Sequence, residues 1–289
     1  MNRFGALTVC IALMLGGCAS GGSKNAPVLS DQAPVEKVAA KGDQSALAGD
    51  YLAASTLYRH ALTLEPSADL WYRYGMSLVM LDDHKQAMWA FRNALALEPE
   101  HEGSLQRVAL YLTSKGKADV AKEYLERLLA VDPDNWRGYN ALGVVADLEE
   151  RFDDAAGYYQ QAIDINGKSA LLWNNLGYSR YLADDFEEAR RHLEKSVELD
   201  PNYAAPRRNL ALVHARNEEY SDALRMMLTT EDEAAAFTDV GLLAFKLGHY
   251  DQAEILLAEA VRRSPTYNQE ATENLDAVRK VIRSRERKG

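Results

Sequence analysis

The sequence predicts an all-α solenoid of about seven helical hairpins, closed by a C-terminal capping helix. Two observations carry this prediction: one set of residue types recurs along the chain, and its period stays close to 34 residues. Gly143 and Gly177 lie 34 residues apart, as do Pro99 and Pro133, whereas Pro66 and Pro99 lie 33 apart. A hairpin of this size cannot bury its own apolar face, so stacking of neighbouring hairpins must supply the core.

The recurring set is a large residue, an apolar-Gly pair three positions later, an Ala and an aromatic or Leu beyond the turn, and a closing Pro. It occurs as Trp71, Tyr74, Gly75, Ala87, Phe91, Ala94 and Pro99; as Trp173, Leu176, Gly177, Ala189, Leu193 and Pro201; and as Phe237, Val240, Gly241, Ala253, Leu257, Ala260 and Pro265. Weaker copies contain Gly42, Ala121, Leu142 and Leu210. The set resembles the tetratricopeptide repeat (TPR), which implies a right-handed superhelical solenoid over residues 35–267.

Each position of the repeat has a physical role. Gly and Ala allow the two helices of a hairpin to approach closely, aromatic or Leu side chains fill the space against the next hairpin, and proline ends the second helix. Asn166-Gly167 replaces the expected proline and still breaks a helix. The segment from Pro206 to Glu233 is short, so we expect an irregular corner over residues 229–232, and we expect a capping helix within residues 268–289.

The N-terminus has the order of a secretory signal. Asn2 and Arg3 precede an apolar run, Phe4 to Leu15, that is too short for a bilayer of about 30 Å. The run ends in Leu-Gly-Gly-Cys18, which resembles the lipobox of bacterial lipoproteins. The resemblance implies that residues 1–17 are a cleaved signal peptide and that Cys18 carries lipid. An ordinary cleaved signal peptide or an N-terminal membrane helix is the alternative.

The resemblance also implies a location. Ala19 stands where an aspartate would indicate retention in the inner membrane, so the outer membrane, on its periplasmic face, is expected. Residues 18–34 are then the lipidated cysteine and a disordered tether, because small polar residues and two prolines cannot bury apolar surface. The other cysteine, Cys10, lies in the removed part, so the mature chain has no disulfide.

Composition and motifs indicate protein binding without catalysis. The chain has 33 Lys+Arg against 43 Asp+Glu, a net charge of −10, which is the wrong balance for a nucleic-acid binder. None of the six histidines forms an HExxH motif or pairs with cysteine at zinc-ligand spacing, and no P-loop or nucleophile elbow occurs. We therefore predict no enzyme activity, no cofactor and no metal site.

Two groups of charged residues need an explanation. Acidic pairs recur at one phase of the repeat: Glu149-Glu150 with Asp153-Asp154, Asp184-Asp185 with Glu187-Glu188, and Glu218-Glu219 with Asp222. They are expected to cap the second helices and to complement the helix dipole. The basic tail holds Arg279, Lys280, Arg283, Arg285, Arg287 and Lys288. A solvated face of the capping helix is the favoured interpretation, and docking to an acidic partner or to anionic headgroups is the alternative.

The predicted partner-binding groove follows from the repeat register. In TPR proteins the second, fifth, sixth, ninth and twelfth positions of the first helix tend to face a bound segment. Here they include Tyr72, Arg73, Met76, Arg107, Arg137, Asn140, Asn174, Asn175, Tyr178, Tyr181, Arg208 and Asn209. Arginine forks bind carboxylates and tyrosines offer flat apolar area, so the set favours a peptide or protein. Contacts between helices are the alternative role, above all for Asn175.

The C-terminal arrangement narrows the resemblance. With its lipobox and tether, the chain resembles the TadD-like TPR lipoproteins of tight-adherence (Tad/Flp) pilus systems. The C-terminal residues that carry this resemblance are Gly241, Gly248 to Ala253, Ser264-Pro265-Thr266-Tyr267, Ala271 and Asn274-Leu275. That resemblance implies a pilotin-like role toward an outer-membrane secretin or another pilus assembly protein. A type IV pilus pilotin, or a scaffold for peptidoglycan or β-barrel machinery, would share this layout.

Overall fold

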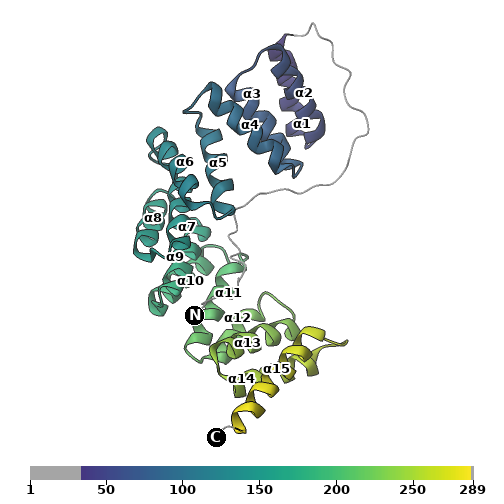
Figure 1. Cartoon of the computed structure of the whole chain (residues 1–289), viewed down its shortest axis with the longest axis vertical. Coiled ribbons are helices and arrows are strands. Elements are labelled where there is room, and N and C mark those ends of the chain that lie inside the picture. The colour runs from purple at the N-terminus through teal and green to yellow at the C-terminus, as the bar shows by residue number, and fades with distance from the viewer. Residues whose placement is uncertain (1–33, 288–289) are drawn as a thin grey trace. The chain divides into compact units, whose positions relative to one another are not determined.

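The computed structural model describes residues 34–287, which form fifteen helices and no strand (Figure 1). The helices are α1 (Val35–Leu47), α2 (Tyr51–Leu64), α3 (Ala68–Met80), α4 (His84–Leu97), α5 (Glu102–Ser114), α6 (Ala118–Val131), α7 (Trp136–Leu148), α8 (Phe152–Ile165), α9 (Ala170–Leu182), α10 (Phe186–Leu199), α11 (Ala205–Arg216), α12 (Tyr220–Met227), α13 (Glu233–Leu247), α14 (Tyr250–Arg263) and α15 (Gln269–Glu286).

The predicted fold class is confirmed: α1 to α14 are seven successive helix pairs, and α15 follows as the additional helix. The odd-numbered helices are the first helices of the repeats and the even-numbered ones the second helices. The chain divides between Arg151 and Phe152 into two compact units, unit 1 with α1 to α7 and unit 2 with α8 to α15. Each unit is described below by itself.

The turn inside each pair contains one residue with positive φ. In three turns this residue is a glycine, for example Gly49 (φ 79°) and Gly248 (φ 86°), which adopts this conformation without strain. In four turns it is acidic, and these residues are Asp82, Glu150, Asp184 and Glu218, with φ between 57° and 62°. One member of each acidic pair therefore forms the turn, the first in Asp184-Asp185 and Glu218-Glu219 and the second in Glu149-Glu150, a role that the capping interpretation did not include.

The predicted capping occurs at Asp185, and Asp83, which the sequence analysis did not name, caps α4 in the same way. The carboxylate of Asp83 accepts a hydrogen bond from the Gln86 N–H at 3.0 Å, and Asp185 accepts from the Glu188 N–H at 3.3 Å. Glu219 makes no such bond at the start of α12, so the capping prediction is wrong there. Its longer side chain turns instead to His214.

The contact between the two helices of a pair depends on glycine at the eighth repeat position. A Cβ added to Gly75 in α3 would lie 2.6 Å from Cε1 of Phe91 in α4, and one on Gly42 would lie 2.7 Å from Cε1 of Tyr58. Phe91 is 1% exposed and is among the largest fully buried side chains. The ring therefore occupies the space that any larger residue at the glycine would need.

The expected irregularities lie where the sequence places them. Helix α8 ends at Ile165, directly before Asn166-Gly167. Helix α12 has only eight residues, and turns occupy residues 228–230 before α13 begins at Glu233. The core of unit 2 nevertheless continues past this corner, because Tyr220 and Met227 pack in one cluster with Val240, Leu257 and Val278.

The signal peptide, Cys18 and the tether lie outside the described residues, except for Pro34. Within residues 34–287, no helix combines the length and the apolar character needed to cross a membrane.

The close approach at Gly75 leads to a first prediction. Gly75→Ala should lower the free energy of unfolding by about 1–3 kcal/mol, because Phe91 must leave its place in a packed core. Gly157→Ala is the matched control: it lies inside α8 with nothing within 4 Å of the added Cβ, and should gain about 0.5–1 kcal/mol of helix propensity. Urea denaturation followed by circular dichroism measures both. Equal effects of the two substitutions would contradict the packing argument.

The two neighbouring acids before α4 should differ in their contributions. Asp83→Ala removes the cap and should cost about 1 kcal/mol. Asp82→Gly should change stability by less than about 0.5 kcal/mol, since glycine accepts the positive φ at this position. The same denaturation measurement tests the pair, and a larger loss from Asp82→Gly would contradict these roles.

Candidate functional site

The first helices of successive pairs touch one another within each unit. Helix α5 contacts α7 in unit 1, and in unit 2 α11 contacts both α9 and α13. Within a unit the second helix packs against its own first helix, as α2 does with α1 and α10 with α9, and several second helices also contact the next first helix, as α2 does with α3. We call the exposed side of the first helices the inner face; ten residues of the predicted groove are exposed or half-buried there, whereas Asn140 and Asn174 are buried.

Arg73 in unit 1 is part of an internal charge network. Its Nη1 donates to both carboxylate oxygens of Asp43 in α1, at 3.1 and 3.3 Å, and its Nη2 pairs with Asp69 in the preceding turn of α3. The hydroxyl of Tyr58 donates to the same Asp43 at 2.7 Å. Burial, together with this acceptor, raises the pKa of Tyr58 well above its usual range. Two carboxylates thus neutralise Arg73, which corrects its predicted role as a free fork for a partner.

Tyr72 and Asn140 also belong to the scaffold. The Tyr72 ring packs against His101, with centroids 5.3 Å apart, and against Phe91 at 5.9 Å. It fills the space above Gly103, where an added Cβ would come within 2.8 Å of the ring. The Asn140 side chain is 4% exposed. Burial therefore keeps Asn140 from direct contact with a partner, which corrects its predicted role, whereas Tyr72 is half-buried and its role stays a prediction.

The remaining predicted residues of unit 1 differ in their surroundings. Met76 is half-buried, and Arg137 is exposed with its guanidinium 4.2 Å from the Trp136 ring centroid. Arg107 in α5 is half-buried, and its Nε is inaccessible to solvent without a hydrogen-bond partner in the described chain. A buried donor of a charged group costs free energy while it stays unpaired. Arg107 is therefore the inner-face arginine of unit 1 that is best prepared to receive a carboxylate.

Three asparagines of unit 2 are joined by hydrogen bonds. The Asn209 amide in α11 donates to Asn174 Oδ1 in α9 at 2.8 Å, and the Asn174 amide donates to Asn175 Oδ1 at 3.2 Å. Asn174 is only 5% exposed. It therefore links neighbouring first helices and is not available to a partner, which corrects its predicted role. Asn175 and Asn209 remain half-buried at the inner face.

The two tyrosines of α9 form a continuous apolar surface. Tyr178 and Tyr181 stack with centroids 6.0 Å apart and planes at 19°, and Tyr181 also meets Phe186 at 5.8 Å. Burial raises the pKa of the Tyr181 hydroxyl. The pair lies one and two turns from Asn174, so a half-buried aromatic surface adjoins the asparagine amides.

Arg208 brings two acids into the site that the sequence analysis did not name. Its Nε lies 3.5 Å from Oε1 of Glu231, whose Oε2 is inaccessible to solvent without a partner in the described residues. Burial raises the pKa of Glu231, and the nearby Asp239 of α13 raises it further. Asp239 occupies the sixth repeat position, equivalent to Arg73 and Asn175, so the register could have identified it. Glu231 lies in the irregular corner, where no register applies.

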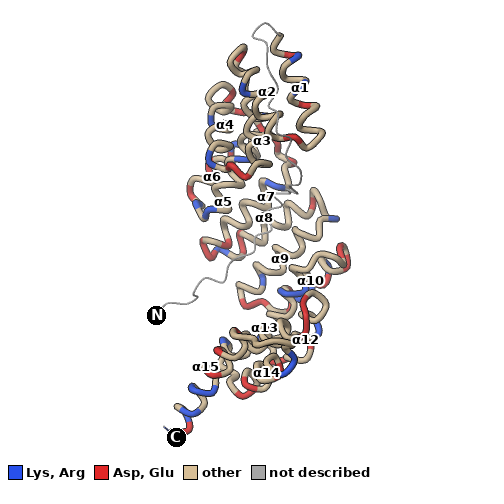
Figure 2. Tube along the Cα trace, turned by 90° about the vertical axis from the view of Figure 1, so that its right-hand side faces the viewer, with Lys and Arg blue, Asp and Glu red and all other residues tan. Residues whose placement is uncertain are grey.

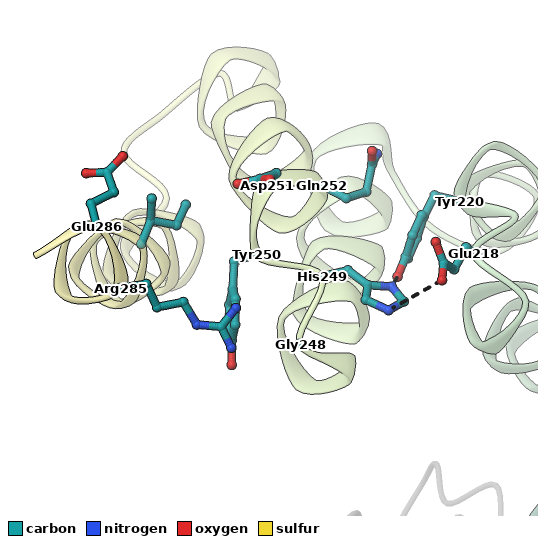
Figure 3. Close-up of a pocket in the computed structure, with 10 residues that line it drawn as sticks. Glu218, Tyr220, Gly248, His249, Tyr250, Asp251, Gln252, Arg285 and Glu286 are labelled. Atoms are coloured by element: carbon teal, nitrogen blue, oxygen red, sulfur yellow. Dashed lines mark hydrogen bonds and ion pairs between the residues drawn. The ribbon is translucent and has the colours of Figure 1, made fainter. Parts of the chain in front are cut away.

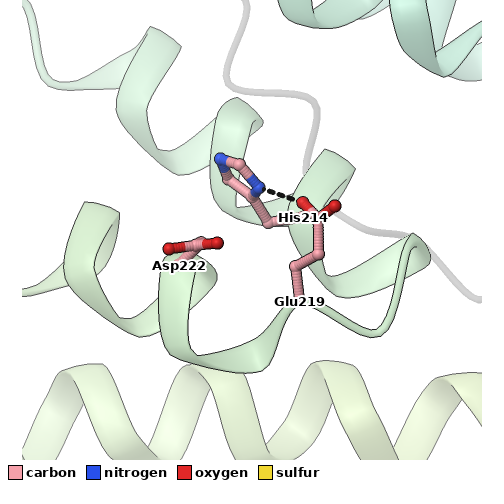
Figure 4. A group of neighbouring side chains, drawn as sticks. All are labelled: His214, Glu219 and Asp222. Atoms are coloured by element: carbon pink, nitrogen blue, oxygen red, sulfur yellow. Dashed lines mark hydrogen bonds and ion pairs between the residues drawn. The ribbon is translucent and has the colours of Figure 1, made fainter.

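Among the described residues, one cluster has the ligand types of a metal site. His214, Glu219 and Asp222 place their ligand atoms within 4.8 Å of one another (Figure 4). His214 Nδ1 donates to Glu219 Oε2 at 2.6 Å, and this bond lowers the pKa of the Glu219 carboxyl. Arg190 lies 3.8 Å from Glu219, and Arg225 pairs with Asp222. The two arginines already balance the two carboxylates, so the cluster is a network of ion pairs at the turn between α11 and α12.

A cavity of about 610 Å³ lies where two turns of unit 2 meet α15 (Figure 3). The Tyr220 hydroxyl bonds to Nδ1 of His249, whose Nε2 lies 3.7 Å from Glu218. Arg285 lies over the Tyr250 ring at 4.1 Å. These contacts join α12, α14 and α15, so the lining residues support the cap.

The basic tail is partly used in docking the cap. Figure 2 shows its cations gathered at the C-terminal end of α15. Arg279 pairs with Glu254 of α14 at 2.7 Å, whereas Lys280 and Arg283 are exposed. Lys280 and Arg283 therefore fit the interpretation of a solvated outer face, whereas Arg279 and Arg285 contact side chains of α14.

Comparisons with known families agree with this architecture. Residues 170–203 and 234–267 match tetratricopeptide-repeat profiles. Residues 42–145 match the middle TPR-like domain of cilia and flagella-associated protein 70. No curated protein matches the sequence.

Solved structures show the same fold at low identity. A tetratricopeptide-repeat protein from Parabacteroides merdae is 16% identical with a TM-score of 0.64, over 84% of this chain and 98% of its own. PilF of Pseudomonas aeruginosa is 21% identical with a TM-score of 0.54, over 71% and 95%. MamA of Desulfovibrio magneticus RS-1 is 23% identical with a TM-score of 0.54, over 58% and 95%.

Helix pairs with glycine at the close contact, a repeat near 34 residues and two matched repeat profiles together identify the chain as a tetratricopeptide-repeat protein.

Proposed function

We propose that this chain is a lipid-anchored TPR protein of the outer membrane. In this role it binds a pilus assembly protein at its inner face, as a pilotin-like factor for a tight-adherence secretin. The observation that carries the binding role is the inner face itself. There Arg107 presents an unpaired guanidinium in unit 1, and the Tyr178–Tyr181 stack presents an apolar surface in unit 2. Arg107 suits a carboxylate of a bound protein, and the tyrosine stack, taken by itself, suits apolar side chains.

The pilus assignment has two supports. The C-terminal sequence and lipobox resemble the TadD-like lipoproteins, and the fold resembles that of PilF, a pilus TPR protein. The likeness to PilF fits a tight-adherence system and another pilus system equally well. A scaffold for peptidoglycan or β-barrel machinery has no specific support in this chain.

The anchor is tested by the two cysteines. Cys18→Ser should abolish incorporation of labelled palmitate and release the protein from the outer-membrane fraction, because the sulfur that accepts the lipid is gone. Cys10→Ser is the matched control and should leave both unchanged, since that residue lies in the predicted signal peptide. A Cys18→Ser protein that still fractionates with the outer membrane would contradict the anchor.

The partner is tested by capture from detergent-solubilised membranes at native expression level. The wild-type chain should retain a secretin, and Arg107→Ala should weaken retention about tenfold or more, equivalent to about 1.4 kcal/mol. Lys122→Ala on α6 removes a cation that has only a 3.9 Å pair with Glu126, and should bind normally. Absence of any pilus protein from the wild-type capture would overturn the pilus role. If Arg107→Ala captures as much secretin as the wild-type chain, the partner does not bind the inner face at Arg107.

A further inference from the structure

The second helices also present a regular surface, on the side away from the first helices. In α4 the residues Lys85, Trp89, Arg92 and Ala96 stand at helical spacing on one face, and all four are exposed. The equivalent residues of α2 are Leu52, Thr56, Arg59 and Thr63, of which only Thr56 is half-buried. We call this row, at the second, sixth, ninth and thirteenth positions of a second helix, the outer stripe.

The charge of the outer stripe changes along the chain. In α6 it holds Asp119, Glu123 and Glu126; in α8, Asp153 and Asp164; and in α10, Glu187, Glu194 and Glu198 beside Arg191. Helices α2 and α4, in contrast, contain no Asp or Glu at any position. The ninth position is Arg59 in α2 and Arg92 in α4, then Glu126 in α6. The outer stripes of α2 and α4 thus depart from the acidic character of a chain whose net charge is −10.

The cations of these two stripes are not neutralised within the described chain. Arg59, Lys85 and Arg92 are exposed and form no ion pair with any residue from 34 to 287. The two acids that directly precede these helices, Asp50 and Asp83, are the N-caps of α2 and α4, and Asp43 and Asp69 pair with Arg73. The positive charge is therefore available to an external anionic group.

Apolar groups lie among these cations. Trp89 is 54% exposed and Leu52 57% exposed. The Trp89 ring meets Trp71 edge-on, with centroids 4.9 Å apart, so its orientation is held by packing. Lys85 and Arg92 flank Trp89, and the two cations lie about 10 Å apart along the helix axis. A tryptophan between cations on an outward face suits the interface of a bilayer, where tryptophan is enriched and each nearby cation contributes about 1 kcal/mol toward anionic lipid.

We propose that the outer stripes of α2 and α4 dock on the surface of an anionic phospholipid bilayer. The choice of a bilayer rests on the proposed lipid anchor, because α1 begins at Val35, only 17 residues after Cys18. The proposed anchor would therefore attach to unit 1 within 17 residues of its first helix. Docking there would hold unit 1 on the lipid surface by its outer stripes and leave its inner face to the partner.

The test uses the chain from Ala19 to Gly289, which contains every described residue and no lipid. It should sediment with vesicles of phosphatidylcholine containing about 30% phosphatidylglycerol, and not with pure phosphatidylcholine. The double variant Arg59→Glu/Arg92→Glu should weaken binding about tenfold or more, because each substitution reverses one charge. Arg191→Glu, on the outer stripe of α10, is the matched control and should bind like the wild-type chain.

A second readout locates the contact. Brominated lipid should quench the fluorescence of the bound chain, and Trp89→Phe should lose most of this quenching although Trp71, Trp136 and Trp173 remain. The wild-type and variant chains should have matching circular dichroism and thermal midpoints, since the substituted residues are exposed.

Three results would overturn the docking proposal: no binding to anionic vesicles, full binding by the double variant, or equal weakening by Arg191→Glu. Capture of an acidic protein through the same residues, without vesicle binding, would assign the face to that partner instead. Because the assayed chain lacks Cys18, failure here leaves the anchor intact. The result of the Cys18 experiment, in turn, does not change vesicle binding by this chain, because the assayed chain carries no lipid.

Discussion

The close contact between glycine and a buried ring or Leu is the constraint on which the scaffold depends. At Gly42, Gly75, Gly177 and Gly241 the opposing second helix places a side chain within 2.6 to 2.8 Å of where a Cβ would stand. The helices of a pair can approach only because that atom is absent. This approach buries the larger side chains, such as Phe91 and Leu193, and their burial in turn supports the stacking of one pair on the next.

This constraint determines the residue types at the buried positions, whereas the residues on two surfaces, the inner face and the outer stripes, differ from one repeat to the next. On the inner face, charge is partly used within the scaffold: Arg73 is neutralised by Asp43 and Asp69, whereas Arg107 stays unpaired. On the outer stripes, cations and Trp89 occur in α2 and α4, and acids occur in α6 to α10. Binding specificity in such a repeat array resides in these surface positions, since the repeat does not determine them.

The shortened pair α11–α12 shows what happens when the repeat is interrupted. Helix α12 lacks its last turns, and Glu219 bonds to His214 instead of capping the helix. The chain reaches α13 through a corner that brings Glu231 beside Arg208 and Asp239 on the inner face. Ion pairs from Arg190 and Arg225 balance the acids at the turn. The irregular pair thus adds charged groups to unit 2 that a regular repeat would not bring together.

The sequence alone determined the helical pairs, their period, the short sixth pair and the extra terminal helix, because glycine, proline and apolar positions act through local geometry and recur. It also identified the inner-face register. It could not show that Asn140 and Asn174 are buried or that Arg73 is neutralised, because these depend on the packing of neighbouring helices. Asp43 lies 30 residues from Arg73, and Asn209 lies 35 residues from Asn174. Tertiary packing alone decided which polar residues of one register bond within the scaffold and which, like Nε of Arg107, have no hydrogen-bond partner in the described chain.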